Sequence, residues 1–322
     1  MSGLVYEPEY AKAIAPFANA SSPVPTTALE MRAASNSLFS VVMPKVPPGD
    51  KIQQTSFTVR SYDGAEIELR RYATREHIEV SEPQPAVLAI HGGGFIAGNI
   101  DLSGGGCANT ALAADRPVFA VAYRLAPEHP APTGVEDAFA AFKYLVEHAA
   151  ELNIDPARIG IKGKSAGAGV GAGMALMARD RAFSPPPAKL VLVYPMLDDR
   201  TKYPEDAAFL KLVVWAPERN NLAWGAYVGE DKAGKPDADV SPYAAPARAE
   251  SLRGLPSTYI DIGTLDLFRD EALEFAQRLM KDDVEVEFHL IPGVPHAFDL
   301  VAVGSKWQVR AEEARAVALK SF

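Results

Sequence analysis

Short apolar runs separated by helical stretches fill most of the chain. Each run is nearly continuous, which is typical of parallel strands buried on both faces of a sheet. The runs are 86–90, 118–122, 158–162, 189–194, 258–262 and 286–291. Between and after them, apolar residues recur at helical spacing in 135–145, 166–179, 270–281 and 308–319. Strand alternating with helix predicts a doubly wound α/β domain with a mostly parallel central sheet flanked by helices.

An alternating pattern precedes these runs. Phe57 and Val59 come before a turn at 62–65, and Ile67 and Leu69 follow it. This pattern predicts a β-hairpin at the start of the sheet.

Two segments do not follow the strand and helix alternation. Residues 1–50 are rich in Pro, Ala and Ser, with one short amphipathic helix around 29–39, and residues 195–256 mix Pro, Trp and charged residues. Apolar residues in the second segment require burial, which argues against a long surface loop. We therefore expect an N-terminal cap arm over 1–50 and a cap insertion over 195–256, covering one edge of the sheet. Together they would form a small helical cap on one α/β domain made of 51–194 and 257–322.

The charge balance narrows the possible partners. The 322 residues include 32 Lys and Arg against 41 Asp and Glu, giving a formal net charge of −9, and the longest basic run is Arg70-Arg71. Such a surface repels a phosphate backbone, so we expect no nucleic-acid partner. The apolar runs fall far short of the roughly 18 residues of a membrane span, so we expect no membrane partner. The first ten residues lack the charged and apolar regions of a signal peptide, and Cys107 is the sole cysteine, so no internal disulfide can form. We therefore expect a cytoplasmic protein.

A G-x-S-x-G pentapeptide, 163–167, lies directly after the strand predicted at 158–162 and before a helical stretch. This context is what a nucleophile elbow requires. Small flanking residues are needed because the tight turn strains the backbone of the serine. The pattern predicts an exposed nucleophile at Ser165, with a plain Gly-rich turn as the alternative.

A second glycine pattern overlaps the first. Residues 167–172 satisfy the G-x-G-x-x-A fingerprint of dinucleotide-binding proteins. That fingerprint needs its first glycine at a strand end and an acidic residue ending a second strand about 20 positions later. Here the first glycine is already inside the predicted helix, and Asp180 lies in no strand. We therefore favour close packing of a helix on the sheet over a nicotinamide oxidoreductase, and we expect no cofactor and no metal.

Three consecutive glycines, 92–94, follow His91 at the end of the strand predicted at 86–90. Backbone N–H groups in such a loop have no side chains to shield them. They can donate hydrogen bonds to an oxygen that becomes negative in a tetrahedral intermediate. Beside G-x-S-x-G, the loop predicts an oxyanion hole, with a merely flexible loop as the alternative.

A serine nucleophile needs a base. In the chain order serine, acid, histidine, only His289 and His296 remain. His289 falls on the opposite face of an alternating run, where we expect it to pack under a helix. His296 lies in a loop after the carboxyl end of the strand 286–291, where open α/β sheets bind ligands. The pattern therefore favours His296.

The acid must orient this histidine, so it should leave the carboxyl end of the preceding strand. Asp266 follows the strand 258–262 and meets this condition. Asp261 lies within the strand, and Asp270 has the place of a helix-capping residue. The placement favours Asp266.

With these motifs the sequence resembles the hormone-sensitive-lipase family of α/β-hydrolase esterases. The matching segments are HGGGF at 91–95, YRLAPEHPAP at 123–132, GKSAG at 163–167, DLFRDE at 266–271 and HAF at 296–298. The resemblance implies the α/β-hydrolase fold, a catalytic triad and an oxyanion hole. The roles it implies are nucleophile Ser165, acid Asp266, base His296, and oxyanion donors from the backbones of Gly93, Gly94 and Ala166.

These features predict a carboxylesterase-type serine hydrolase that cleaves small-molecule esters through an acyl-enzyme. The expected acyl chains are short to medium, because the cap carries Phe209, Leu212, Trp215 and Trp224 but the surface lacks an apolar stretch suited to a lipid interface. An amidase or arylformamidase would use the same groups and remains open. A non-catalytic small-ligand receptor on this fold is less favoured, because such relatives lose the histidine. The sequence is also compatible with a homodimer.

Lys164 departs from the family pattern, which usually has Asp or Thr before the serine. Because lysine is seldom buried unpaired, we expect its ammonium to pair with a carboxylate beneath the elbow. The alternative is that its charge adds to the field at the oxyanion or attracts an anionic substrate.

Overall fold

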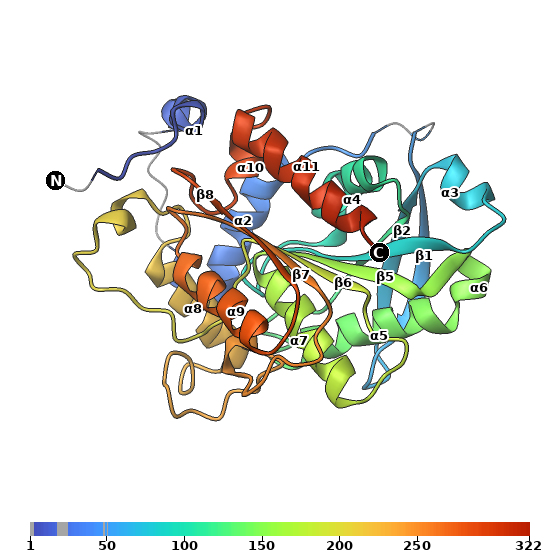
Figure 1. The fold of residues 1–322 in the computed structure, drawn as a ribbon. Helices are drawn as coiled ribbons and strands as arrows, with labels where there is room; N and C mark the ends of the chain where they lie inside the picture. Colours follow the sequence, from blue (N-terminus) through green and yellow to red (C-terminus); the bar gives the residue numbers. More distant parts are fainter. Residues whose placement is uncertain (1–2, 18–24, 48, 50) are drawn as a thin grey trace.

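One eight-stranded sheet forms the centre of the molecule in the computed structural model, which describes residues 3–17, 25–47, 49 and 51–322 (Figure 1). The strand order is β1-β2-β4-β3-β5-β6-β7-β8. The pairs β1–β2 and β2–β4 are antiparallel, and all pairs from β4 to β8 are parallel. The strands are β1 Gln53–Arg60, β2 Glu66–Ala73, β3 Gln84–Ile90, β4 Val118–Val121, β5 Ile154–Lys164, β6 Lys189–Val193, β7 Thr258–Gly263 and β8 Val286–Ile291.

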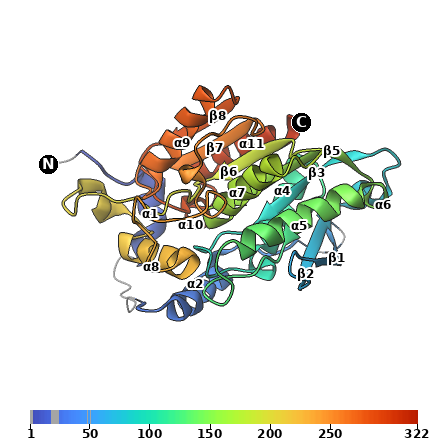
Figure 2. The same ribbon diagram turned by 90° about the horizontal axis from the view of Figure 1, so that it is seen from below.

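Helices cover both faces of this sheet. The views in Figures 1 and 2 place α4 and α11 on one face and α5, α7 and α9 on the other. The helices are α1 Pro8–Ile14, α2 Ala28–Val42, α3 Arg75–Glu79, α4 Ile100–Ala114, α5 Thr133–Glu147, α6 Ala149–Leu152, α7 Ala166–Asp180, α8 Pro217–Val228, α9 Arg269–Lys281, α10 Phe298–Val301 and α11 Lys306–Lys320. Short 3₁₀ turns are η1 Ala15–Phe17, η2 Ala208–Leu212 and η3 Pro246–Arg248. This arrangement is the predicted α/β-hydrolase fold.

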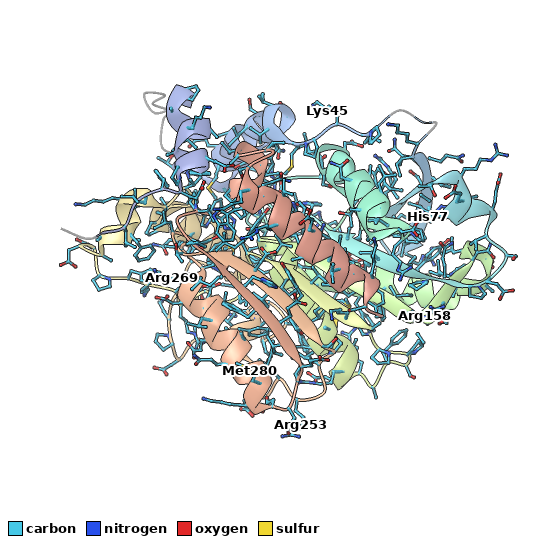
Figure 3. All side chains as sticks on the ribbon, turned by 45° about the horizontal axis from the view of Figure 1, so that its top comes forward. Lys45, His77, Arg158, Arg253, Arg269 and Met280 are labelled. Carbon is cyan, nitrogen blue, oxygen red and sulfur yellow. The ribbon has the colours of Figure 1, made fainter. Side chains whose placement is uncertain are left out.

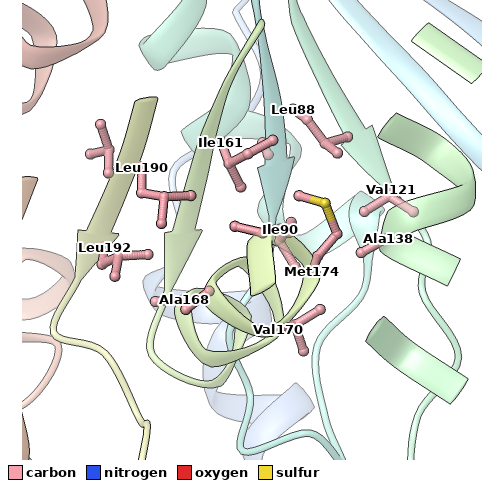
Figure 4. Packing of buried hydrophobic residues seen from close by; sticks show 14 of the residues in the cluster. Leu88, Ile90, Val121, Ala138, Ile161, Ala168, Val170, Met174, Leu190 and Leu192 are labelled. Carbon is pink, nitrogen blue, oxygen red and sulfur yellow. The ribbon is translucent and has the colours of Figure 1, made fainter. Parts of the chain in front are cut away.

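The core beneath the site is packed between the sheet and α7. Leu88, Ile161 and Leu190 are register neighbours on one sheet face, and Val170 and Met174 of α7 pack within the same buried cluster (Figure 4). All five are at most 1% exposed. Burial of this kind stabilises the fold by about 25 cal/mol per Å² of apolar surface, so the sheet is a rigid base for the loops at its carboxyl edge.

The predicted hairpin and all six predicted strands are present, with β5 beginning four residues before the predicted start at Arg158. Helix α4 was not predicted, because three glycines, 104–106, interrupt its pattern. At one of these positions, the structure shows why glycine is needed. A Cβ on Gly105 would lie 1.8 Å from the carbonyl oxygen of Pro44. The backbone at Pro44 can therefore pass this close to α4 because Gly105 has no side chain.

The two segments outside the alternation lie near the carboxyl ends of the strands. Helix α2 packs against α8, and α1 packs against α10; residues 1, 2, 18–24, 48 and 50 of the predicted arm lie outside the described residues. The expectation that 195–256 covers one edge of the sheet stays a prediction. This segment follows the interior strand β6, and its Trp215 lies against Gly94 and 6.4 Å, centroid to centroid, from the His296 ring.

The helices that flank the sheet expose some apolar side chains to solvent, among them Leu112 of α4 and Val317 of α11. Met280 of α9 is 57% exposed and Arg253 lies at the same end of the molecule (Figure 3). Across the described ranges, the structure contains no helix with the length and apolar character needed to cross a bilayer.

Candidate active site

Ser165 occupies a sharp turn between β5 and α7. Its backbone has φ 54° and ψ −122°, a conformation that L-residues rarely adopt and that costs about 1–3 kcal/mol. The turn is held by the Ser165 N–H, which donates to the carbonyl of Val193 over 2.9 Å. A Cβ on Gly163 would lie 2.4 Å from the Cα of Ala168, so the turn needs glycine at its first position. The G-x-S-x-G pattern therefore forms a strained elbow that presents the serine.

His296 lies between Ser165 and Asp266, in the loop that joins β8 to α10. Its Nε2 is 2.8 Å from Ser165 Oγ, and its Nδ1 is 2.8 Å from Asp266 Oδ2. With the proton on Nδ1, the imidazole donates to the carboxylate and accepts from the serine hydroxyl. The histidine is 8% exposed and the aspartate fully buried. The structure thus places the three predicted residues in one hydrogen-bonded series.

The Asp266 carboxylate is itself oriented by the chain. It follows β7 by three residues, and its Oδ1 accepts the N–H of Phe268 over 3.0 Å. The ring of Phe268 stands almost perpendicular to that of His296, with the centroids 5.1 Å apart. These contacts fix both the acid and the plane of the imidazole.

The rival candidates lie elsewhere. Asp261 is bound by Arg315, and Asp270 pairs with Arg269 at the surface. The expectation that His289 packs under a helix is wrong, because it lies on the edge strand β8 with 41% of its side chain exposed and hydrogen bonds to Glu287. Its place at the edge of the sheet leaves one side open to solvent.

The glycine loop lies directly beside the elbow. A Cβ on Gly92 would be 2.8 Å from the carbonyl oxygen of Lys164, and Gly93 and Gly94 have φ of +130° and +61°. In the part of the chain that the structure describes, the N–H groups of Gly93, Gly94 and Ala166 donate to no protein acceptor. Ala166 is also the first residue of α7, where the helix dipole favours negative charge. The site therefore has donors available beside Ser165.

Helix α2 holds this loop from the other side. Arg32 Nε donates to the carbonyl of Ile96 over 2.5 Å, and Asn36 Oδ1 accepts the N–H of Gly98 over 2.8 Å. Sequence reasoning missed both residues. Their only signal was a four-residue spacing that puts them on one helix face.

Trp215 of the 195–256 segment lies beside the site, with its ring centroid 6.4 Å from that of His296. Its indole N–H donates to Asn220 Oδ1 over 3.2 Å, and its ring carbons lie against Gly94. Trp224 instead packs under the glycine loop, 1% exposed with its ring centroid 4.8 Å from that of Phe95. Of the two tryptophans expected to shape the substrate pocket, Trp215 alone borders the site.

Lys164 has the carboxylate partner that we expected beneath the elbow. Its Nζ lies 3.0 Å from Asp299 Oδ2 and 3.8 Å from Glu312 Oε1. The side chain is 26% exposed, whereas that of Asp299 is 2% exposed. The ammonium therefore contacts the buried side of the site.

Comparison with known proteins agrees with this fold. Residues 87–300 match the family model of the alpha/beta hydrolase fold. The esterase LipI of Mycobacterium tuberculosis is 37% identical, with the alignment covering 66% of this chain and 65% of LipI. The carboxylesterase NlhH of the same organism is 33% identical over 79% of this chain and 77% of the relative. The chain spans between 57% and 65% of the length of LipI and two other curated relatives.

A solved structure covers nearly the whole chain. The structure titled bacterial heroin esterase superposes with a TM-score of 0.88 at 35% identity, covering 98% of this chain and 97% of the other. The similarity therefore extends over the sheet, the elbow and the two segments at the carboxyl ends of the strands.

Proposed function

The chain belongs to the hormone-sensitive-lipase family of the alpha/beta hydrolase fold, and on this premise we propose that it is a serine hydrolase that cleaves carboxylic esters. The observation that carries this proposal is the series of two 2.8 Å hydrogen bonds joining Ser165, His296 and Asp266. Relatives named esterase and carboxylesterase support it.

In the proposed reaction, Ser165 Oγ attacks the ester carbonyl while His296 Nε2 takes its proton. Asp266 stabilises the resulting imidazolium through Nδ1. Collapse of the tetrahedral intermediate breaks the bond to the alcohol, which leaves with the proton from His296, and an acyl-enzyme remains. Water then attacks with His296 as base, and the acid product is released.

The oxyanion of the intermediate would accept hydrogen bonds from the N–H groups of Gly93, Gly94 and Ala166. Their lack of protein acceptors in the described ranges supports this role, as does the close packing of the loop on the elbow. One such donor contributes about 10²–10³ in kcat in comparable sites. In the proposed reaction, the oxyanion hole therefore makes a large contribution to kcat.

The N-terminal arm and the 195–256 segment would form the cap over this site. The contact of α2 with α8 and the place of Trp215 beside Gly94 and His296 support that division. We expect the ring at this position to limit the length of the acyl chain that the site accepts, so the proposed substrates are small esters of short to medium acyl chains. A cytoplasmic location, a homodimer and the exclusion of nucleic acid stay predictions.

Hydrolysis of p-nitrophenyl esters from acetyl to palmitoyl, with matched anilides, tests the proposal. We expect the highest kcat/KM on the shorter esters, weak activity on anilides, and loss of most activity with Ser165→Ala. Faster turnover of anilides than of esters would instead indicate the amidase. Equal activity of wild type and Ser165→Ala would contradict a serine hydrolase altogether.

A further inference from the structure

A cluster of buried charges lies behind the site, and the proposed reaction does not use it. At its centre is the carboxylate of Asp299, three residues after His296 and 2% exposed. Its Oδ2 accepts hydrogen bonds from Lys164 Nζ over 3.0 Å and from Arg315 Nη1 over 2.7 Å. Its Oδ1 accepts from the hydroxyl of Tyr194 over 3.0 Å. Asp299 thus binds three side chains that come from three parts of the chain.

These partners lie at the strands that carry the proposed triad. Lys164 is the last residue of β5 and directly precedes Ser165, while Tyr194 directly follows β6. Arg315 of α11 also binds Asp261 of β7 through two hydrogen bonds of 2.6 and 2.8 Å. Through these contacts, Asp299 joins the loop that carries His296 to the strand end that presents Ser165 and to the strand that leads to Asp266.

Tyr194 also touches the imidazole. Its ring is steeply inclined to that of His296, at 67° with the centroids 4.8 Å apart. The backbone N–H of Tyr194 donates to the carbonyl of Asp261 over 2.7 Å, and its hydroxyl is held by Asp299. The tyrosine is therefore fixed at both ends, with its ring against the proposed base.

The charges in this cluster are costly to bury, and they are compensated by one another and by Glu312, which accepts a hydrogen bond from Arg315 Nη1 over 2.8 Å. Burial acts to raise the pKa of Asp299, but the charges of Lys164 and Arg315 outweigh burial and hold that pKa below its usual range. A buried ion pair of this kind is weak evidence for stability, because desolvation offsets much of the attraction. What such a cluster can supply is a fixed relative placement of the segments it joins. Hydrolase sites need this, because a misplacement of about 1 Å can lower the rate by about 10².

We propose that Asp299 is a positioning residue that holds His296 against Ser165, acting through Tyr194 and through the loop that it shares with the histidine. This inference rests on the proposed serine hydrolase. Lys164 is one of three partners, so its loss leaves Asp299 bound to Arg315 and Tyr194. Loss of the Asp299 charge affects all three contacts at once.

The test compares Asp299→Asn and Tyr194→Phe with a matched control, Asp137→Asn in α5. Asp137 is fully buried, and its carboxylate accepts hydrogen bonds of 2.9 and 2.8 Å from Nε and Nη2 of Arg124. It lies on α5, outside the segments proposed to form the cap and the triad. For each variant we would measure kcat and KM on p-nitrophenyl acetate, the rate of Ser165 labelling by a serine-directed phosphonate, and the melting temperature.

We expect Asp299→Asn to lower both kcat and the labelling rate by about 10-fold or more, within the range for displaced catalytic groups, with KM little changed. Tyr194→Phe should also lower kcat and the labelling rate, by a smaller factor than Asp299→Asn. The control should lose melting temperature and keep its kcat.

Wild-type kcat and labelling in Asp299→Asn would overturn the inference. So would a loss of kcat in Asp137→Asn as large as that in Asp299→Asn at a similar loss of melting temperature, because destabilisation alone would then explain both. If Asp299→Asn does not fold, Tyr194→Phe decides: normal kcat and labelling there would overturn the proposal. Failure of the underlying function gives a different result, because the wild-type protein itself would then not be labelled at Ser165.

Discussion

Replacing Gly94 with alanine should impair turnover far more than folding. Gly94 has φ +61°, where an alanine costs roughly 1–2 kcal/mol. Its Cβ would lie 2.7 Å from Cη2 and 3.1 Å from Cζ2 of Trp215. Since real Cβ atoms do not approach other atoms this closely, either the indole or the glycine loop must move. Movement of the loop displaces the N–H groups proposed to bind the oxyanion.

The expected loss follows from those donors. Removing one oxyanion donor lowers kcat by about 10²–10³, so Gly94→Ala should reduce kcat on a short p-nitrophenyl ester by about 10². Adding Trp215→Ala removes the clashing ring but leaves the strain at φ. Gly94→Ala should therefore lower kcat by a smaller factor in Trp215→Ala than in the wild type.

Gly106→Ala in α4 is the matched control. Among the described residues, no atom beyond its chain neighbours and the backbone of its own helix lies within 4 Å of its Cβ position. An alanine inside a helix is favoured over glycine by about 0.5–1 kcal/mol. Its kcat should equal that of the wild type, with an equal or higher melting temperature. Wild-type kcat in Gly94→Ala would refute this reasoning, and so would an equal factor of loss from Gly94→Ala in the wild type and in Trp215→Ala.

Four further substitutions test the site. Ser165→Ala and His296→Ala should each remove most activity, with little further loss when combined, because the groups act as a unit; multiplicative losses in kcat would argue against a triad. Asp266→Asn should lower kcat by about 10⁴, because asparagine favours the wrong imidazole tautomer; full activity would move this role to another carboxylate. Lys164→Thr should lower the melting temperature more than it lowers hydrolysis of a neutral ester, since Asp299 keeps its other partners. An unchanged melting temperature with strongly reduced turnover of every ester would favour the alternative role of the lysine charge.

The parts of the fold that depend on a local pattern of apolar residues could be predicted from the sequence. Buried strands such as β3 and β6 are continuous apolar runs, and their bounds were predicted within two residues. Helix α4 was not predicted, because its glycines interrupt the helical pattern. One of them, Gly105, is needed for the close approach of Pro44, which lies about 60 residues earlier in the chain. No local pattern reports such a crossing, because the reason for the glycine lies in another segment.

The candidate site shows the same division. Chain order and strand ends were enough to select Ser165, Asp266 and His296, which lie together in the structure; their catalytic roles stay predictions. The partner of Lys164 could be predicted only as a carboxylate, because the sequence contains 41 acidic residues and nothing in it singles out Asp299. The place of Trp215 was equally hidden, since the orientation of its ring depends on Asn220 and on the packing of α8 near the glycine loop.

The most direct test of the central claim is intact-mass spectrometry of the protein after reaction with a serine-directed p-nitrophenyl phosphonate, followed by peptide mapping. The account predicts one adduct per chain, located on Ser165, formed in step with the loss of esterase activity and absent from Ser165→Ala. An adduct on another residue, or inactivation of Ser165→Ala at the wild-type rate, would contradict it.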